Sequence, residues 1–183
     1  MRVPVQYRVY LALGSNVGDR MEHLRAALRA LSSLPVSRVT RTSRVYETRP
    51  VGPSDAPYLN AVVEYETVAA PLPLLDVCLQ IERARGRRRE TEARWGARTL
   101  DLDLLVVQVD GMQVKLRRSR LELPHPRMRA RDFVLRPLAE LAPDLVIDDA
   151  PVFQWLAKLP PSELTVTGRH PERLLPTPPS DAH

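Results

Sequence analysis

The order of the patterned segments constrains the fold of this 183-residue chain more than any other feature of the sequence. Apolar periodicity predicts a strand, a helix, two strands, a second helix and a further strand. The predicted segments are a strand at 9–13, a helix between Asp19 and Pro35, strands at 38–47 and 59–66, a helix at 71–85 and a strand from Thr99 to Val109. This order is typical of an α+β fold, the ferredoxin-like sandwich, in which two helices pack on one face of an antiparallel sheet. The other face of the sheet is then expected to be open to ligands.

Four local signals refine this prediction. Asp19 with Glu22 forms a capping box for the first helix. The dipeptide Asp110-Gly111 predicts a hairpin between strands at 104–109 and 112–116. Residues 133–141 predict a short helix that is interrupted or begins near Pro137. The segment 49–57 contains three prolines and a glycine, which predicts a loop that could act as a lid.

Length and composition predict one domain over residues 1–159 and a Pro-rich, flexible C-terminal tail over 160–183. A single cysteine excludes an internal disulfide framework. We find neither the apolar stretch of a signal peptide nor the roughly 18 apolar residues of a membrane span. The sequence therefore predicts a cytoplasmic protein without a membrane partner, and we expect a monomer.

Asp101 and Asp103 are the residues that point most directly to chemistry. They alternate with leucines at 100, 102 and 104, so both carboxylates are expected on one face of a strand, a geometry that suits a divalent cation. Residues 83–98 contain seven arginines and two acids, a net charge of +5 that equals the formal charge of the whole chain. Arginine forks beside paired carboxylates favour a polyphosphate held with Mg²⁺.

Each of these patterns has a plainer interpretation. An Asp-x-Asp pair can simply face solvent, and an arginine-rich stretch can be a solvated helix end or a footprint for nucleic acid. Tyr58 and Phe133 border loops, where aromatic rings either hold a flat heterocycle or pack in the core. A ferredoxin-like sheet also binds RNA, but the aromatic-rich strand motif of RNA-binding domains is missing, and acidic residues at the sheet centre would repel a phosphate backbone. We therefore expect no nucleic-acid partner.

Five segments together resemble 6-hydroxymethyl-7,8-dihydropterin pyrophosphokinases of folate biosynthesis. The segments are Arg94-Trp95-Gly96-Ala97-Arg98-Thr99-Leu100-Asp101-Leu102-Asp103, Leu123-Pro124-His125-Pro126-Arg127-Met128, Arg131-Asp132-Phe133-Val134-Leu135, Leu11-Ala12-Leu13-Gly14-Ser15-Asn16 and Tyr58-Leu59-Asn60-Ala61. The resemblance extends over about residues 9–155. It implies an enzyme that transfers the β,γ-pyrophosphoryl group of ATP, its co-substrate, to the pterin hydroxymethyl group and releases AMP, with two Mg²⁺ ions.

The resemblance also implies roles for individual residues. The metal ligands would be Asp101 and Asp103, which would act in catalysis together with Arg89 and Arg94. The nucleotide would be bound by Glu82, Arg94, Trp95, Arg98, Leu104, His125 and Arg131. The pterin would be bound by Thr48, Val51, Gly52, Tyr58, Asn60, Trp95 and Phe133. Gly14-Ser15-Asn16 would form the floor of the pocket. The choice between Arg87, Arg88 and Arg89 as the phosphate clamp stays open, because the loop from Gly86 to Arg94 is slightly longer than is usual in the family.

Overall fold

The computed structural model of the chain describes residues 4–49, 56–87, 98–160 and the backbone of 166–173. Its main sheet has the strand order β11-β3-β4-β1-β5-β6, with β2 also paired to β4, and every pairing within it is antiparallel. The elements are β1 (Tyr7–Ser15), α1 (Arg20–Ser32), β2 (Arg38–Thr42), β3 (Arg44–Thr48), β4 (Tyr58–Thr67), α2 (Pro71–Ala84), β5 (Asp101–Val109), β6 (Met112–Gln113), β7 (Leu116–Arg118), β8 (Leu121–Leu123), the 3₁₀ helix η1 (Met128–Ala130), α3 (Asp132–Leu141), β9 (Val146–Ile147), β10 (Ala150–Pro151), α4 (Val152–Ala157) and β11 (Val166–Arg173). The predicted mixture of helices with an antiparallel sheet is confirmed.

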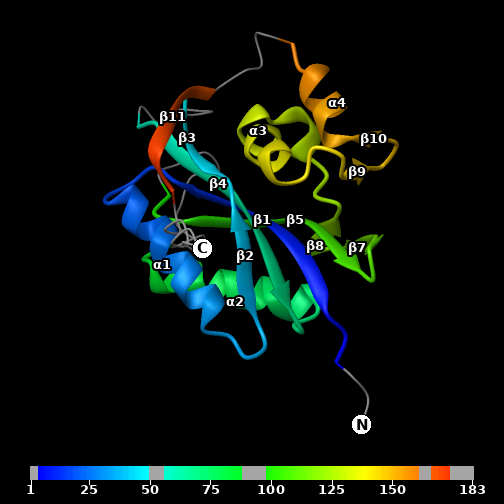
Figure 1. Cartoon of the computed structure of the whole chain (residues 1–183). Coiled ribbons are helices and arrows are strands. Elements are labelled where there is room, and N and C mark those ends of the chain that lie inside the picture. The colour runs from blue at the N-terminus through cyan, green and yellow to red at the C-terminus, as the bar shows by residue number, and fades with distance from the viewer. Residues whose placement is uncertain (1–3, 50–55, 88–97, 161–165, 174–183) are drawn as a thin grey trace, which may run out of the picture.

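Helices α1 and α2 cover one face of the sheet (Figure 1). Leu24 and Leu28 of α1 and Leu74 of α2 are fully buried against the sheet, as their helical spacing predicts. The predicted N-cap of α1 is confirmed, because the Asp19 side chain accepts a hydrogen bond from the Glu22 amide at 3.0 Å.

The expectation that the other face is open is wrong where a second core packs on it. Helices α3 and α4 lie on that side (Figure 1) and pack a second core on β4 and β5. Val62 is fully buried there between two polar neighbours of the same strand face, so the strand alternation alone does not reveal a second apolar layer. In β5 the register against β1 shifts at Leu105, and this bulge turns both Leu105 and Val106 into the second core.

Other local predictions had mixed outcomes. The Asp110-Gly111 hairpin is confirmed, and the two residues have φ angles of 50° and 77°, as in a type I′ turn. The single strand predicted at 38–47 is two strands, β2 and β3, because Ser43 leaves the ladder and its hydroxyl accepts a hydrogen bond from the Val62 amide. The predicted break near Pro137 is wrong, since α3 begins at Asp132 and continues through the proline.

Part of the segment predicted to be a flexible tail forms an edge strand. Residues 166–173 are β11, which pairs with β3. A strand can pair with the edge of a sheet through backbone hydrogen bonds alone and needs few apolar side chains, so the composition of the segment did not predict a strand. The division into a domain over 1–159 and a tail stays a prediction. Among the described helices, none has both the length and the apolarity of a membrane span.

Candidate active site

A cavity opens on the part of the sheet that α3 does not cover. It is lined from β1, β3, β4, β5 and the start of α3, so five separate segments meet at one place. The lining residues are Ala12, Leu13, Gly14, Thr48, Arg49, Tyr58, Asn60, Ala61, Arg98, Asp101, Asp103, Arg131, Phe133 and Val134.

Asp101 and Asp103 both face this cavity, as the alternation of β5 predicts. Their strand partners on β1 are Gly14, which has no side chain, and Ala12, which has only a methyl group, so room is left above the sheet. A Cβ atom at Gly14 would lie 3.0 Å from Oδ1 of Asn60, so the glycine permits the close approach of β1 and β4 side chains at the cavity floor.

Asp101 is held by two guanidinium groups. Arg98 contacts its Oδ2 atom and Arg87 contacts its Oδ1 atom, and the carboxylate is 19% exposed. Arg98 is itself positioned by Asn16, whose side-chain oxygen accepts a hydrogen bond from the Arg98 amide at 2.6 Å. This carboxylate therefore has a fixed place at the rim of the cavity, beside Arg87 and Arg98.

Arg131 also lines the cavity, together with Arg98 and Arg49. Burial lowers the pKa of Arg131 from its usual value, while the carboxylates of Asp103 and Asp101 oppose that effect. An arginine remains charged under such conditions, so a partly desolvated positive charge lines the cavity. The same guanidinium lies 5.6 Å from the ring centre of Phe133, which places the cationic and aromatic walls side by side.

His125 is not among the residues that line the cavity, but its Nε2 atom lies 4.0 Å from Oδ2 of Asp103, which does line it. Burial, then Arg131 and Arg127, lower the pKa of His125 to about 4, so the imidazole is neutral at pH 7. Its Nδ1 atom accepts a hydrogen bond from the Arg127 amide at 3.2 Å, which assigns the proton to Nε2. His125 is therefore a neutral hydrogen-bond donor and not a cation. It also lines a neighbouring groove with Lys115, Arg117 and Arg129.

The aromatic end of the cavity contains Tyr58, Phe133, Asn60 and Thr48. The Asn60 amide donates a hydrogen bond to the Thr48 hydroxyl at 2.7 Å, and this bond joins β4 to the end of β3. A flat, polar heterocycle fits such a mixture of rings and amide groups.

Comparison with known proteins identifies the family. Residues 10–143 match the sequence model of 7,8-dihydro-6-hydroxymethylpterin-pyrophosphokinase (HPPK). The chain belongs to the HPPK family. The resemblance stated from the motifs is thereby confirmed.

Relatives support this HPPK assignment over most of the chain. A 2-amino-4-hydroxy-6-hydroxymethyldihydropteridine pyrophosphokinase of Methylorubrum extorquens is 49% identical over 156 residues, which are 85% of this chain and 95% of the relative. The enzyme of the same name from Pseudomonas aeruginosa is 48% identical over 143 residues, 78% of this chain and 85% of the relative. A solved structure, an HPPK-DHPS in complex with substrates, shares the fold, with a TM-score of 0.61 at 12% sequence identity. The match covers 85% of this chain and 43% of the HPPK-DHPS chain.

The HPPK cavity contains most, but not all, of the described residues that the motifs singled out. Asp101, Asp103, Arg98, Arg131, Thr48, Tyr58, Asn60 and Phe133 line it together. The Leu104 side chain alternates with Asp103 and is 2% exposed in the core under the sheet, so its role at the nucleotide stays a prediction. Glu82 likewise lies beneath the sheet, 1% exposed, and accepts a hydrogen bond from the Leu102 amide at 2.8 Å.

Some expectations lie outside the described residues, and the sequence did not indicate Arg49 in the cavity or Glu140 near it. Arg89, Arg94, Trp95, Val51 and Gly52 belong to the undescribed segments, so their roles stay predictions. Arg49 lines the cavity, and its position next to Thr48 at the end of a strand could have suggested it. Glu140 contacts β3 from the far end of α3, and no sequence signal links it to the site.

Proposed function

We propose that this protein transfers the β,γ-pyrophosphoryl group of ATP to 6-hydroxymethyl-7,8-dihydropterin, giving the pterin diphosphate and AMP in folate biosynthesis. The observation that carries the proposal is the single cavity in which an aromatic, amide-containing end adjoins a carboxylate and guanidinium end. The two ends correspond to the two reactants of a pyrophosphokinase, the activity for which the relatives are named.

At the aromatic end, Tyr58 and Phe133 would enclose the pterin ring. Asn60 would hydrogen-bond the edge of the ring, and its bond to Thr48 fixes the orientation of the amide. The rings would also exclude water from the hydroxymethyl group, which would reduce competing transfer of the nucleotide's phosphates to water.

At the charged end, Asp101 and Asp103 have the hard oxygen ligands that Mg²⁺ requires, and both line the cavity. We propose that they hold two Mg²⁺ ions, which when bound would neutralise the charge of the triphosphate. Arg98 and Arg131 would bind phosphate oxygens through their guanidinium groups. The Nε2–H of neutral His125 would donate to a further phosphate oxygen without adding charge.

The chain's contribution to the reaction is alignment and electrostatic stabilisation. The pterin hydroxyl would attack the β-phosphorus in line with the departing AMP, and no side chain forms a covalent intermediate. Arg89, Arg94 and Trp95, with Glu82 and the backbone of Leu104, are proposed as further contributors at the nucleotide end. Val51 and Gly52 are proposed at the pterin end.

Three broader assignments accompany this function. The strand order β3-β4-β1-β5, with α1 and α2 on one face, supports classification as a ferredoxin-like sandwich. We also propose that the protein is a monomer, and that it works in the cytoplasm, where ATP is available.

The decisive experiment measures AMP release by the purified full chain from ATP, Mg²⁺ and 6-hydroxymethyl-7,8-dihydropterin. We expect AMP and pterin diphosphate in equal amounts, with no AMP when the pterin or the metal is omitted. Formation of ADP in place of AMP, or no pterin-dependent product, would overturn the proposal. Salt-sensitive RNA binding without AMP formation would favour the nucleic-acid alternative.

A further inference from the structure

Helix α3 lies along β3, and this arrangement bears on the pterin end of the cavity. Phe133 at the start of α3 lines the cavity with Thr48 at the end of β3. Glu140, near the end of α3, contacts Arg44 at the start of β3. Helix and strand therefore run antiparallel, and the position of the helix along the strand decides where the Phe133 ring lies.

The stretch of α3 from Phe133 to Glu140 is similar in length to β3. Phe133 and Glu140 are seven residues apart, so they are on the same side of the helix and separated by about 10 Å. Arg44 and Thr48 span about 13 Å of strand. A contact made at the Glu140 end consequently fixes the register of α3 at the Phe133 end.

The Glu140 carboxylate makes that contact with both of its oxygens. Oε2 accepts a hydrogen bond from the Arg44 amide at 2.8 Å, and Oε1 accepts one from the Tyr46 hydroxyl. An acidic residue in the last turn of a helix is disfavoured by the helix dipole, so a second role explains it better than helix stability does. Neither Tyr46 nor Glu140 is among the described residues that line the cavity.

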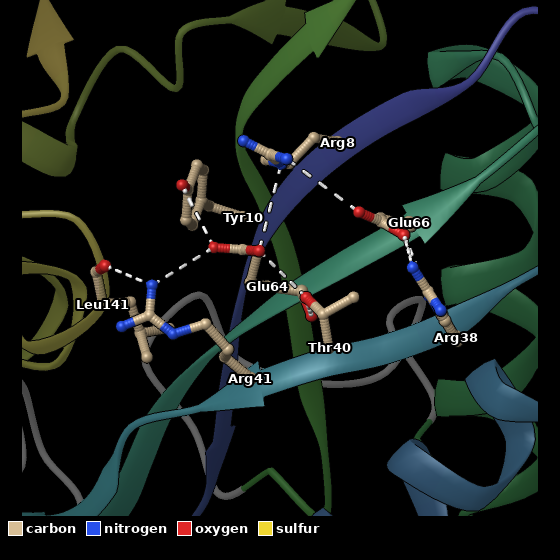
Figure 2. A network of polar contacts seen from close by, with 8 residues as sticks. All are labelled: Arg8, Tyr10, Arg38, Thr40, Arg41, Glu64, Glu66 and Leu141. Atoms are coloured by element: carbon tan, nitrogen blue, oxygen red, sulfur yellow. Dashed lines mark hydrogen bonds and ion pairs between the residues drawn. The ribbon is translucent and has the colours of Figure 1, made fainter. Parts of the chain in front are cut away.

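A second attachment secures the same end of the helix. Arg41 of β2 donates from Nη1 to the Leu141 carbonyl at 2.7 Å, and the same nitrogen lies 3.6 Å from Oε2 of Glu64 (Figure 2). Glu64 is 8% exposed and also accepts hydrogen bonds from Tyr10 and Thr40 (Figure 2). The end of α3 is thus anchored to a buried polar network on the sheet.

Tyr46 is also part of the strand face that carries the pterin residues. Its partner on β4 is Asn60, and the partner of Thr48 is Tyr58. Because Tyr46 and Thr48 are two residues apart, both side chains point to the α3 side of the sheet. The Tyr46–Glu140 bond therefore joins the two walls of the pterin end directly.

We propose that Tyr46 and Glu140 are positioning residues that set the register of α3 on β3 and so place the Phe133 ring for pterin binding. The inference rests on the proposed function. It concerns the pterin more than the nucleotide, because a rigid phenyl ring cannot compensate for a small helix shift. The long side chain of Arg131, at the same end of α3, can still reach its partners.

The test compares Tyr46→Phe, Glu140→Gln and Glu140→Ala with the wild-type chain. Tyr46→Phe removes one hydroxyl and retains the buried ring, so we expect a folded protein. We expect the KM for the pterin to rise about five- to tenfold in Tyr46→Phe. The rise should be larger in Glu140→Ala, which removes both acceptor oxygens. Glu140→Gln should lie between these two variants, since glutamine retains one acceptor oxygen. The KM for ATP should change less than about twofold. The dissociation constant of the pterin, measured by its fluorescence with a nonhydrolysable ATP analogue, should rise in parallel.

Two comparisons separate positioning from general stability. Arg38→Ala breaks an exposed ion pair to Glu66 that does not involve α3, and it should leave the pterin KM unchanged. The double variant Tyr46→Phe with Glu140→Ala should bind pterin no more weakly than Glu140→Ala alone, because Glu140→Ala already removes the Tyr46–Glu140 hydrogen bond that Tyr46→Phe removes.

The possible outcomes separate the positioning role of Tyr46 and Glu140 from the proposed function. A lower Tm with an unchanged pterin KM, or an equal rise in the KM of both substrates, would overturn the positioning role. Absence of pterin-dependent AMP release from the wild-type chain would overturn the proposed function, and the inference with it.

Discussion

Glu82→Gln tests the buried ion pair beneath Asp101. The Glu82 and Arg87 side chains are 1% and 5% exposed, and their charged atoms lie 2.7 Å apart. Removing one member of a buried pair costs about 3–5 kcal/mol, because the remaining charge loses its compensation. Arg87 keeps its contact with Asp101, so we expect the lower end, about 3 kcal/mol. For a chain of this size that corresponds to a Tm lower by roughly 6–12 °C.

The assay is urea and thermal unfolding of the full chain, with a control on the same helix. Asp76→Asn breaks the ion pair of Asp76 with Arg120, whose side chains are 49% and 58% exposed, and it should cost less than about 0.5 kcal/mol. The double variant Glu82→Leu with Arg87→Leu should be more stable than the sum of the single losses predicts. Equal effects of Glu82→Gln and Asp76→Asn would refute the reasoning.

Three further predictions concern the cavity. Asp103→Ala should lower AMP formation about a hundredfold or more with little change in Tm, since its side chain is 36% exposed; near-normal AMP release would refute a role in metal binding. Gly14→Ala should raise the pterin KM about tenfold in steady-state kinetics, because the added Cβ would lie 3.0 Å from Oδ1 of Asn60. An unchanged pterin KM would mean that the Asn60 side chain moves aside without loss of binding. The pKa of His125 is about 4 in the folded protein and 6.5 in the unfolded chain, so the unfolded chain binds a proton first as the pH falls. The contribution of His125 to the free energy of unfolding is therefore full above pH 6.5 and falls by about 3 kcal/mol as the pH drops to 4. Urea unfolding across that range should show a smaller loss in His125→Asn than in the wild-type chain, and equal losses would contradict the shift.

The sequence predicted best where the periodicity of an element decides which way a side chain faces. Asp101 and Asp103 share a face because strand side chains alternate, and the same alternation buries Leu102. Asp19 was identified as an N-cap because its contact is local, three residues away. Such features depend on short-range geometry, and the sequence contains all of it.

The sequence predicted poorly where the environment of a side chain is formed by a distant segment. Glu82 is polar, so the sequence offered no reason to place it under the sheet, where its partners are Arg87 and the Leu102 amide. The second core was missed because Val62 alone separates two polar residues on its strand face, and the bulge at Leu105 cannot be read from periodicity. Glu140 became visible as a site-related residue only once α3 was seen against β3.

Acidic and basic groups are interleaved in the described site, and this arrangement bears on the ligand. Three carboxylates, those of Glu82, Asp101 and Asp103, lie among four guanidiniums, those of Arg49, Arg87, Arg98 and Arg131, while His125 is neutral. The carboxylates offset most of the positive charge and so weaken the long-range attraction for a bare polyanion such as a nucleic-acid backbone, whose binding depends on an excess of positive charge. The arrangement suits instead a triphosphate whose own charge is compensated by Mg²⁺, because the carboxylates then meet the metal while the guanidiniums meet the phosphate oxygens. The alternation of acidic and basic groups, more than the number of arginines, therefore favours a metal–nucleotide complex over RNA.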